Sequence, residues 1–132
     1  MSNLILVISD DRNPDGPLRL ALTKTAPQCQ VEFAGSREEI PPAHRPSLIL
    51  LDLMLSREPA FDVVRWLRTD QRYRHTPVFV LGSEIVDQDV NEAYSLGADS
   101  CLLMRSVSDG FDQIAQGITT YASLIPSPAL PN

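Results

Sequence analysis

The stretch Leu48-Ile-Leu-Leu-Asp52 is a continuously apolar run that ends in a carboxylate. A second run of the same kind, Leu4-Ile-Leu-Val-Ile-Ser9, is followed by the pair Asp10-Asp11. Runs that are apolar throughout are typical of the central strands of a parallel sheet, which are buried on both faces. The carboxyl ends of such strands lie at one edge of the sheet, where ligands bind. The two runs therefore predict that three carboxylates gather at one edge.

Three carboxylates at one site raise the cost of ionising one another unless a cation lies among them. The predicted set offers oxygen ligands and contains no Cys or His, and this composition suits Mg²⁺. We therefore expect a divalent-ion site beside an aspartate that can accept a phosphoryl group.

Composition narrows the class of protein. A chain of 132 residues, 43% hydrophobic and 21% charged, is long enough to bury one proper core. Its net charge of −6 argues against nucleic-acid binding, which needs a basic surface. No apolar run approaches the roughly 20 residues of a membrane span. The start, Met1-Ser-Asn-Leu4, lacks the basic residues of a signal peptide. We therefore expect a cytoplasmic protein without membrane association.

Apolar runs of strand length alternate with helical stretches along the chain. Strands are expected over residues 3–9, 29–34, 47–52, 78–81 and 100–104. Helices are expected over 16–25, from a capping box at Ser36 to Pro41, from Phe61 to Arg72, over 87–96, and from Ser108 to about Leu124. This alternation predicts an α/β, three-layer, doubly wound sandwich with a five-stranded parallel sheet of the flavodoxin-like order 2-1-3-4-5. That order makes strands 3–9 and 47–52 neighbours.

The domain is expected to span residues 1–124. Residues 125–132 are rich in proline and are expected to form a tail or a linker, with or without an output domain beyond them. Cys29 and Cys101 fall in the two predicted edge strands. Four strand spacings, about 19 Å, would separate them, which is too far for a disulfide.

These features resemble the receiver domain of two-component response regulators. The resemblance covers residues 3 to about 124 and rests on five pieces in order: Ile8-Ser-Asp-Asp11, Leu50-Leu-Asp-Leu-Met-Leu55, Val63-Val-Arg-Trp-Leu-Arg68, Pro77-Val-Phe-Val-Leu81 and Leu96-Gly-Ala-Asp-Ser-Cys-Leu102. It implies that Asp52 is a phosphoacceptor for a histidine kinase or phosphotransfer protein. It also implies that Asp10, Asp11, Asp52 and the backbone carbonyl of Met54 hold Mg²⁺. The enzymatic activity implied is limited to Mg²⁺-dependent self-phosphorylation and autodephosphorylation.

The chain departs from the family where the phosphoryl group is sensed. The position of the family's essential Lys holds Met104, and the proline that follows it is replaced by Arg105. The switch Thr or Ser is Gly82, and the aromatic switch position is Cys101. Ser83 and Arg105 each lie one residue past a missing group, so a local backbone twist is needed for either to replace it. The resemblance therefore implies an atypical receiver.

Two functions stay open. The first is a phosphoacceptor signalling domain with degenerate switching, which Asp10, Asp11 and Asp52 favour. The second is a pseudo-receiver that binds proteins without phosphorylation, through the surface formed by residues 87–96, 100–104 and the last helix. By family analogy, the strand over 100–104 is also the face of a weak homodimer. A flavodoxin-like cofactor binder is excluded, because the acidic residues after the first strand repel phosphate.

Helix residues after Phe61 leave a further question open. A basic group, either a partner surface or a solvated helix face, consists of Arg65, Arg68, Arg72, Arg74 and His75. Trp66 lies one position off the apolar stripe, as either a contact residue or a packing residue at the rim of the core.

Overall fold

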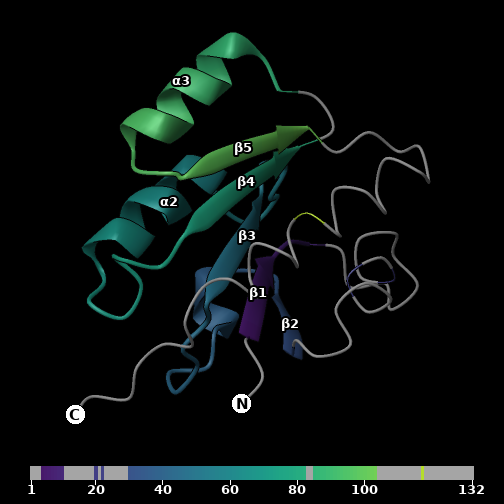
Figure 1. Ribbon diagram of the computed structural model, residues 1–132, viewed down its shortest axis with the longest axis vertical. Helices are drawn as coiled ribbons and strands as arrows, with labels where there is room; N and C mark the ends of the chain where they lie inside the picture. The colour runs from purple at the N-terminus through teal and green to yellow at the C-terminus, as the bar shows by residue number, and fades with distance from the viewer. Residues whose placement is uncertain are drawn as a thin grey trace.

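The computed structural model describes residues 4–10, 20, 22, 30–82, 85–103 and 117. One parallel sheet has the order β2-β1-β3-β4-β5 (Figure 1). Its strands are β1 (Leu4–Ile8), β2 (Gln30–Ala34), β3 (Leu48–Asp52), β4 (Val78–Gly82) and β5 (Ser100–Leu103). The other described elements are a 3-10 turn η1 (Arg37–Glu39) and the helices α2 (Ala60–Thr69) and α3 (Asp87–Ser95). The predicted α/β class and strand order are confirmed.

The strand register fixes which chain segments meet at the carboxyl edge of the sheet. Ile8 at the end of β1 pairs with Leu51 of β3, so Ser9 is level with Asp52. On the other side of β3, Asp52 pairs with Leu81 of β4. The central strands β1, β3 and β4 are buried almost throughout, as continuous apolar runs predict.

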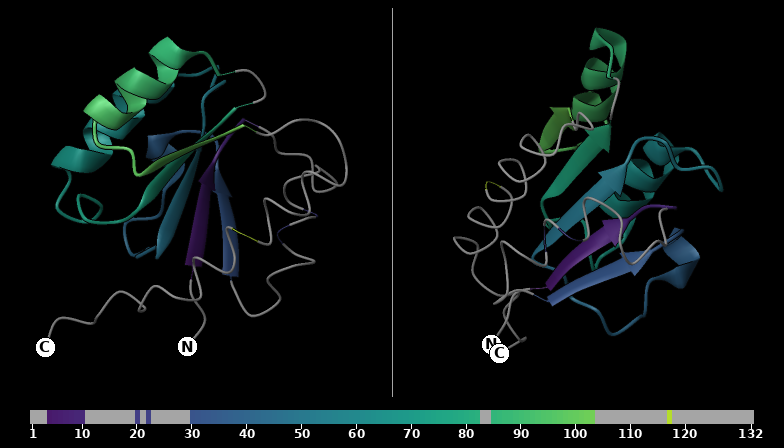
Figure 2. Two further views of the ribbon diagram at one scale, coloured as in Figure 1. Left: turned by 45° about the horizontal axis from the view of Figure 1, so that its top comes forward. Right: turned by 90° about the vertical axis from the view of Figure 1, so that its right-hand side faces the viewer.

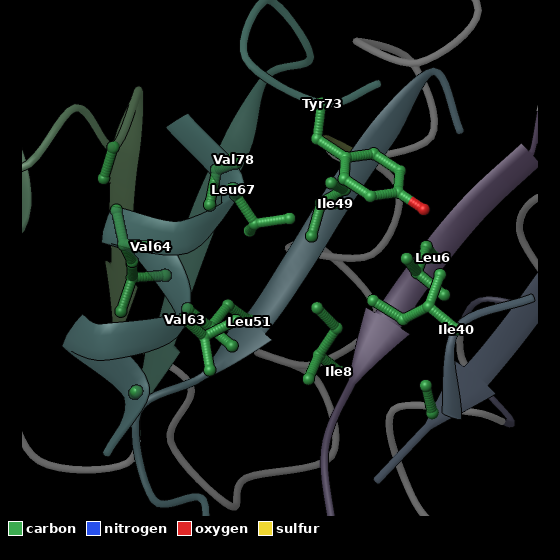
Figure 3. Close-up of a cluster of buried hydrophobic side chains, with 14 of the residues drawn as sticks. Leu6, Ile8, Ile40, Ile49, Leu51, Val63, Val64, Leu67, Tyr73 and Val78 are labelled. Atoms are coloured by element: carbon green, nitrogen blue, oxygen red, sulfur yellow. The ribbon is translucent and has the colours of Figure 1, made fainter. Parts of the chain in front are cut away.

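Side chains from the two faces of the sheet form two separate cores. On one face, α2 and α3 pack against alternate strand residues such as Leu6 and Ile8 (Figures 2 and 3). On the other face, Ile5 and Val7 pack with Leu22, a helical residue. Because alternate strand residues point to opposite faces, a sheet covered on both sides needs apolar residues at every position. This requirement explains why the strand runs are continuous.

Two predicted helix details are wrong. Ser36 makes no side-chain cap at η1, and the Glu39 carboxylate accepts the N–H of Gly35 at 2.9 Å, so the reciprocal capping box does not form. The helix predicted to reach Arg72 ends at Thr69. There, the Asp70 carboxylate accepts the N–H of Arg72 at 2.9 Å, and this local side-chain bond competes with the next helical turn.

Several predictions fall largely or wholly outside the described residues. Of the helix predicted over 16–25, Leu20 and Leu22 are described and both are helical. Of the last predicted helix, only Gly117 is described, and it is helical. Cys29 and the tail over 125–132 lie outside. Across the described ranges, no helix has the length and apolar character needed to cross a membrane.

Candidate functional site

Asp52 ends β3 with both carboxylate oxygens hydrogen-bonded. Its Oδ1 accepts the backbone N–H of Met54 at 2.9 Å. Its Oδ2 accepts the hydroxyl of Ser9 at 3.0 Å, and Ser9 is 6% exposed. One donor comes from the loop that follows the acid, and the other comes from the neighbouring strand. The plane of the carboxylate is therefore fixed from two sides.

Asp10 lies at the same edge, two residues past the end of β1. Its Oδ2 accepts the backbone N–H of Ser56 at 2.6 Å, which ties it to the loop four residues beyond Asp52. Its Oδ1 is buried and has no hydrogen-bond partner among the residues that the structure describes. The structure thus brings Asp10 and Asp52 to one edge, as the two apolar runs predicted.

The unpartnered oxygen of Asp10 fits a divalent cation. A buried acceptor left unsatisfied costs about 1–3 kcal/mol, and more when it is charged, so a cation bound at this oxygen would remove a real penalty. The carboxylate and carbonyl chemistry of the loop suits Mg²⁺, Ca²⁺ or Mn²⁺. Asp11 lies outside the described residues. Within the described ranges, no three Asp, Glu, His or Cys side chains cluster closely enough to hold a metal ion.

Two ion pairs hold the loop after Asp52 against η1. In one pair the cation belongs to η1, and in the other it belongs to the loop. Glu58, 14% exposed, pairs with Arg37 at 2.8 Å from its Nε and also accepts the Arg37 backbone N–H at 3.1 Å. In the second pair, Nη1 of Arg57 lies 2.5 Å from Glu39 Oε2. Sequence reasoning missed both pairs, because no local pattern joins η1 to this loop.

The β4 side of the site offers no hydroxyl at Gly82. A Cβ at this position would lie 2.9 Å from Cγ1 of Ile85 and 3.5 Å from Cβ of Leu53. Such a contact to Ile85 is closer than real Cβ atoms tolerate, so any larger residue requires Ile85 to shift. The backbone at Gly82 therefore lies close to apolar side-chain atoms of Ile85 and Leu53.

The β5 side carries Cys101, a free, half-buried thiol that pairs across the sheet with Val80. Burial, and to a smaller extent the charge of Asp89, raises the pKa of this thiol. A protonated thiol is a weak nucleophile and a poor metal ligand. The other predicted switch positions, Ser83, Met104 and Arg105, lie outside the described residues.

Arg68 fits neither reading of the basic group, whereas Arg65, Arg74 and His75 are exposed. The Arg68 side chain is 18% exposed and pairs with Asp99 at 2.8 Å. The same guanidinium donates to four backbone carbonyls, those of Gly97, Tyr73, Arg74 and Thr76. Gly97 has a φ of 106°, which favours glycine. A Cβ at this position would lie only 3.0 Å from Cγ of Arg68, so the glycine leaves room for the arginine side chain. Arg68 is thus a structural tie between the end of α2 and the start of β5, away from Asp52.

Trp66 is a packing residue at the rim of the core. Its ring lies 5.7 Å from that of Tyr73, and the Arg37 guanidinium lies 5.8 Å from its centroid. Arg72 stacks over the other aromatic ring, 4.8 Å from the centroid of Tyr73. Each of the two neighbouring rings is thus covered by one guanidinium, and the contact with Tyr73 explains the place of Arg72 in the basic group without a partner.

Comparison with known proteins agrees with the strand order. No protein-family model matches the chain. Over 38 residues it is 42% identical to the polar-differentiation response regulator DivK of Brucella anthropi, a match that spans 29% of this chain and 31% of DivK. Among solved structures, the phosphorylated cyanobacterial phytochrome response regulator RcpA has a TM-score of 0.82 at 24% identity, covering 96% of this chain and 100% of that one. The chain has the receiver fold.

A second similar structure is the Mn²⁺-bound form of the response regulator Rcp1. Its TM-score is 0.79 at 22% identity, and the match covers 96% of this chain and 99% of that one. The receiver fold of this second neighbour therefore accommodates a divalent cation. At these identities, the structural likeness establishes the fold of the present chain, and its chemistry has to be argued from its own residues.

Proposed function

We propose that this protein is a receiver of two-component signalling that accepts a phosphoryl group on Asp52. The donor would be a phosphohistidine of a histidine kinase or phosphotransfer protein. The observation that carries the proposal is the pair of hydrogen-bonded carboxylates at the ends of β1 and β3, where one buried oxygen of Asp10 has no partner within the described part of the chain. The receiver fold places such a pair at the edge of the sheet where ligands bind.

Mg²⁺ belongs to this proposal. Asp10, Asp11, Asp52 and the backbone carbonyl of Met54 would hold it. The Mn²⁺-bound Rcp1 supports divalent binding in this fold. When bound, the ion offsets negative charge as the phosphoryl group reaches the carboxylate.

The chain's own residues position the acceptor. The N–H of Met54 holds Oδ1 of Asp52, and the Asp10–Ser56 contact holds the loop beside it. Because phosphoryl transfer depends mostly on positioning and electrostatic stabilisation, a fixed carboxylate supplies much of what the reaction needs.

We propose that switching is degenerate. Gly82 has no hydroxyl to contact a phosphoryl group, and Met104 has no ammonium to pair with one. A ligand shifts a conformational equilibrium only by its differential affinity for the two states. With fewer contacts specific to the phosphorylated state, the population shift on phosphorylation is small.

The alternative is a pseudo-receiver that binds proteins without phosphorylation. The packing of Gly82 against Ile85 favours it, because this packing leaves no room for a switch hydroxyl. Its binding surface would consist of α3, β5 and the last predicted helix, which is also where a downstream protein would bind under the first proposal. A weak homodimer through β5 and a cytoplasmic location are further parts of the proposal.

Intact-mass measurement after incubation with Mg²⁺ and acetyl phosphate separates the two functions. We expect one added phosphate on the wild-type protein, lost in Asp52→Ala. Asp62→Ala is the matched control, because Asp62 is an exposed acid on α2, paired only locally with Arg65. Absence of an adduct, together with absence of Mg²⁺ binding in calorimetry, would refute the phosphoacceptor proposal in favour of the pseudo-receiver. A Met104→Lys variant with faster uptake would show that the missing ammonium limits the reaction.

A further inference from the structure

We infer that Ser9, which directly follows β1, is a positioning residue for phosphoryl transfer and orients the Asp52 carboxylate through its hydroxyl. The inference rests on the proposed role of Asp52 as the acceptor. It assigns a function to the residue that precedes the acidic pair, which the sequence patterns and the resemblance include without giving it a role.

The position of Ser9 is set by the sheet. Its backbone N–H donates to the carbonyl of Ala34 on β2 at 2.9 Å. The register of β1 with β3, in which Ile8 pairs with Leu51, puts the next residue level with Asp52. The hydroxyl then donates to Asp52 Oδ2 at 3.0 Å from a residue that is 6% exposed. The contact thus depends on strand pairing, with no flexible loop in between.

The two donors to Asp52 differ in what they need from the sequence. The N–H of Met54, on Oδ1, is a backbone group that every residue except proline would offer. The donor on Oδ2 exists only because residue 9 carries a hydroxyl. Charge-assisted hydrogen bonds to a carboxylate are stronger than neutral ones, and two of them fix the direction in which the nucleophilic oxygen points. The orientation of the acceptor is therefore specified by Ser9.

The reaction requires no proton from Ser9. An Asp52 oxygen forms a bond to phosphorus, and the bond from phosphorus to the donor's leaving atom breaks, with the electron pair departing on the leaving group. The hydroxyl keeps its proton throughout and changes only the oxygen to which it donates. It contacts the carboxylate before transfer, and the acyl phosphate offers carbonyl and phosphoryl oxygens afterwards.

The β4 side cannot supply this contact as it is packed. Gly82 has no side chain, and an added Cβ would meet Ile85 at 2.9 Å. Among the contacts of the described residues, the hydroxyl that reaches Asp52 comes from Ser9. A phosphoryl-dependent change would accordingly act through β1 and β2, to which the backbone of Ser9 is bonded.

The test compares Ser9→Thr with Ser9→Val, because threonine and valine side chains are nearly equal in size and only threonine carries a hydroxyl. Ser9→Ala is a third variant. Initial rates of phosphate uptake are measured over a range of acetyl phosphate concentrations with Mg²⁺. We expect Ser9→Val and Ser9→Ala to lower the maximal rate about tenfold, with little change in the half-saturating concentration, while Ser9→Thr stays within about twofold of wild type. Ser47→Ala, a buried serine at the opposite edge of the sheet, serves as the control and should change neither value.

A second measurement needs no phosphodonor. The amide NMR signal of Met54 reports the other hydrogen bond of the same carboxylate, so it should move in Ser9→Val and Ser9→Ala and return toward wild type in Ser9→Thr. If wild type takes up no phosphate but this signal responds as expected, the proposed function fails and the positioning contact stands. A folded Ser9→Ala with wild-type rate, or an unmoved Met54 signal, overturns the inference. Should Ser9→Val not fold, Ser9→Ala and Ser9→Thr make the same comparison.

Discussion

The β1–β3 half of the sheet and the β4–β5 half place their polar contacts at opposite edges. In the first half, Ser9, Asp10 and Asp52 make theirs at the carboxyl edge. In the second half, Asp99 accepts both Arg68 and the N–H of Val78 at the amino edge, before β4 and β5 begin. At the carboxyl edge of this half, Gly82 has no polar side chain, and its backbone lies close to the side chain of Ile85.

Under the proposed function, this difference would separate phosphoryl acceptance from sensing. One half presents two hydrogen-bonded carboxylates at the carboxyl edge, and the other has its polar network at the opposite edge. Acceptance would need only the first half, whereas switching would need a polar group at the carboxyl end of the second. The predictions below test this division, from the largest expected effect to the smallest.

Arg68→Ala should lower the free energy of unfolding by about 3 kcal/mol. The substitution removes the guanidinium that donates both to the Asp99 carboxylate and to several partly buried backbone carbonyls. Urea denaturation measures the change. Arg65→Ala is the control, with an expected loss below about 0.5 kcal/mol, because Arg65 is 59% exposed and pairs only with Asp62. Equal losses in the two variants would show that the amino-edge network does not order the β4–β5 half.

Gly82→Ala should destabilise the protein by about 1–2 kcal/mol, because the new Cβ crowds Ile85 at 2.9 Å. In an Ile85→Ala background, the same substitution should cost at least about 1 kcal/mol less, since the crowding atoms are gone. Denaturation of all four proteins of the cycle gives the coupling. A stabilising Gly82→Ala in wild type would mean that Ile85 yields easily and that a switch hydroxyl fits after all.

Tyr73→Phe should raise the free energy of unfolding by about 1 kcal/mol. Tyr73 is fully buried, and its hydroxyl has no partner among the described residues. Figure 3 shows the hydroxyl pointing toward the side chains of Leu6 and Ile40, which belong to the same core cluster as Tyr73. Thermal and urea unfolding measure the gain. Tyr94→Phe, at a residue 49% exposed, should be neutral, and a marked loss in Tyr73→Phe would reveal a hydrogen bond.

Asp70→Asn should have the smallest effect, a loss of about 0.5 kcal/mol at pH 7. Hydrogen bonds from the Arg72 side chain and backbone lower the pKa of Asp70. A carboxylate whose folded pKa lies below its unfolded value of about 3.9 contributes stability above that pH, and this contribution disappears as the pH falls through the folded pKa. The difference between wild type and variant should therefore shrink as the pH falls below about 3.9. A difference that does not change with pH in acid would assign the effect to packing.

Sequence alone determined the sheet and the meeting of Asp10 with Asp52. Continuous apolar runs mark strands that are covered on both faces, and parallel strand order brings their carboxyl ends together. Burial and backbone pairing determine both features, so the strand arrangement does not depend on which side chains surround Asp10 and Asp52. The interpretation of Gly82 as the place of a missing switch hydroxyl, which comes from counting along the chain, stays a prediction.

Tertiary structure decided which side chains those acids and the neighbouring arginines contact. Ser9 and Asp52 are 43 residues apart, Arg68 and Gly97 are 29 apart, and Arg57 and Glu39 are 18 apart. A hydrogen bond depends on tenths of an ångström and on direction, and no local pattern fixes either across such separations. Arg68 therefore read as a surface charge and Ser9 as a strand-end residue, until the packed sheet supplied their partners.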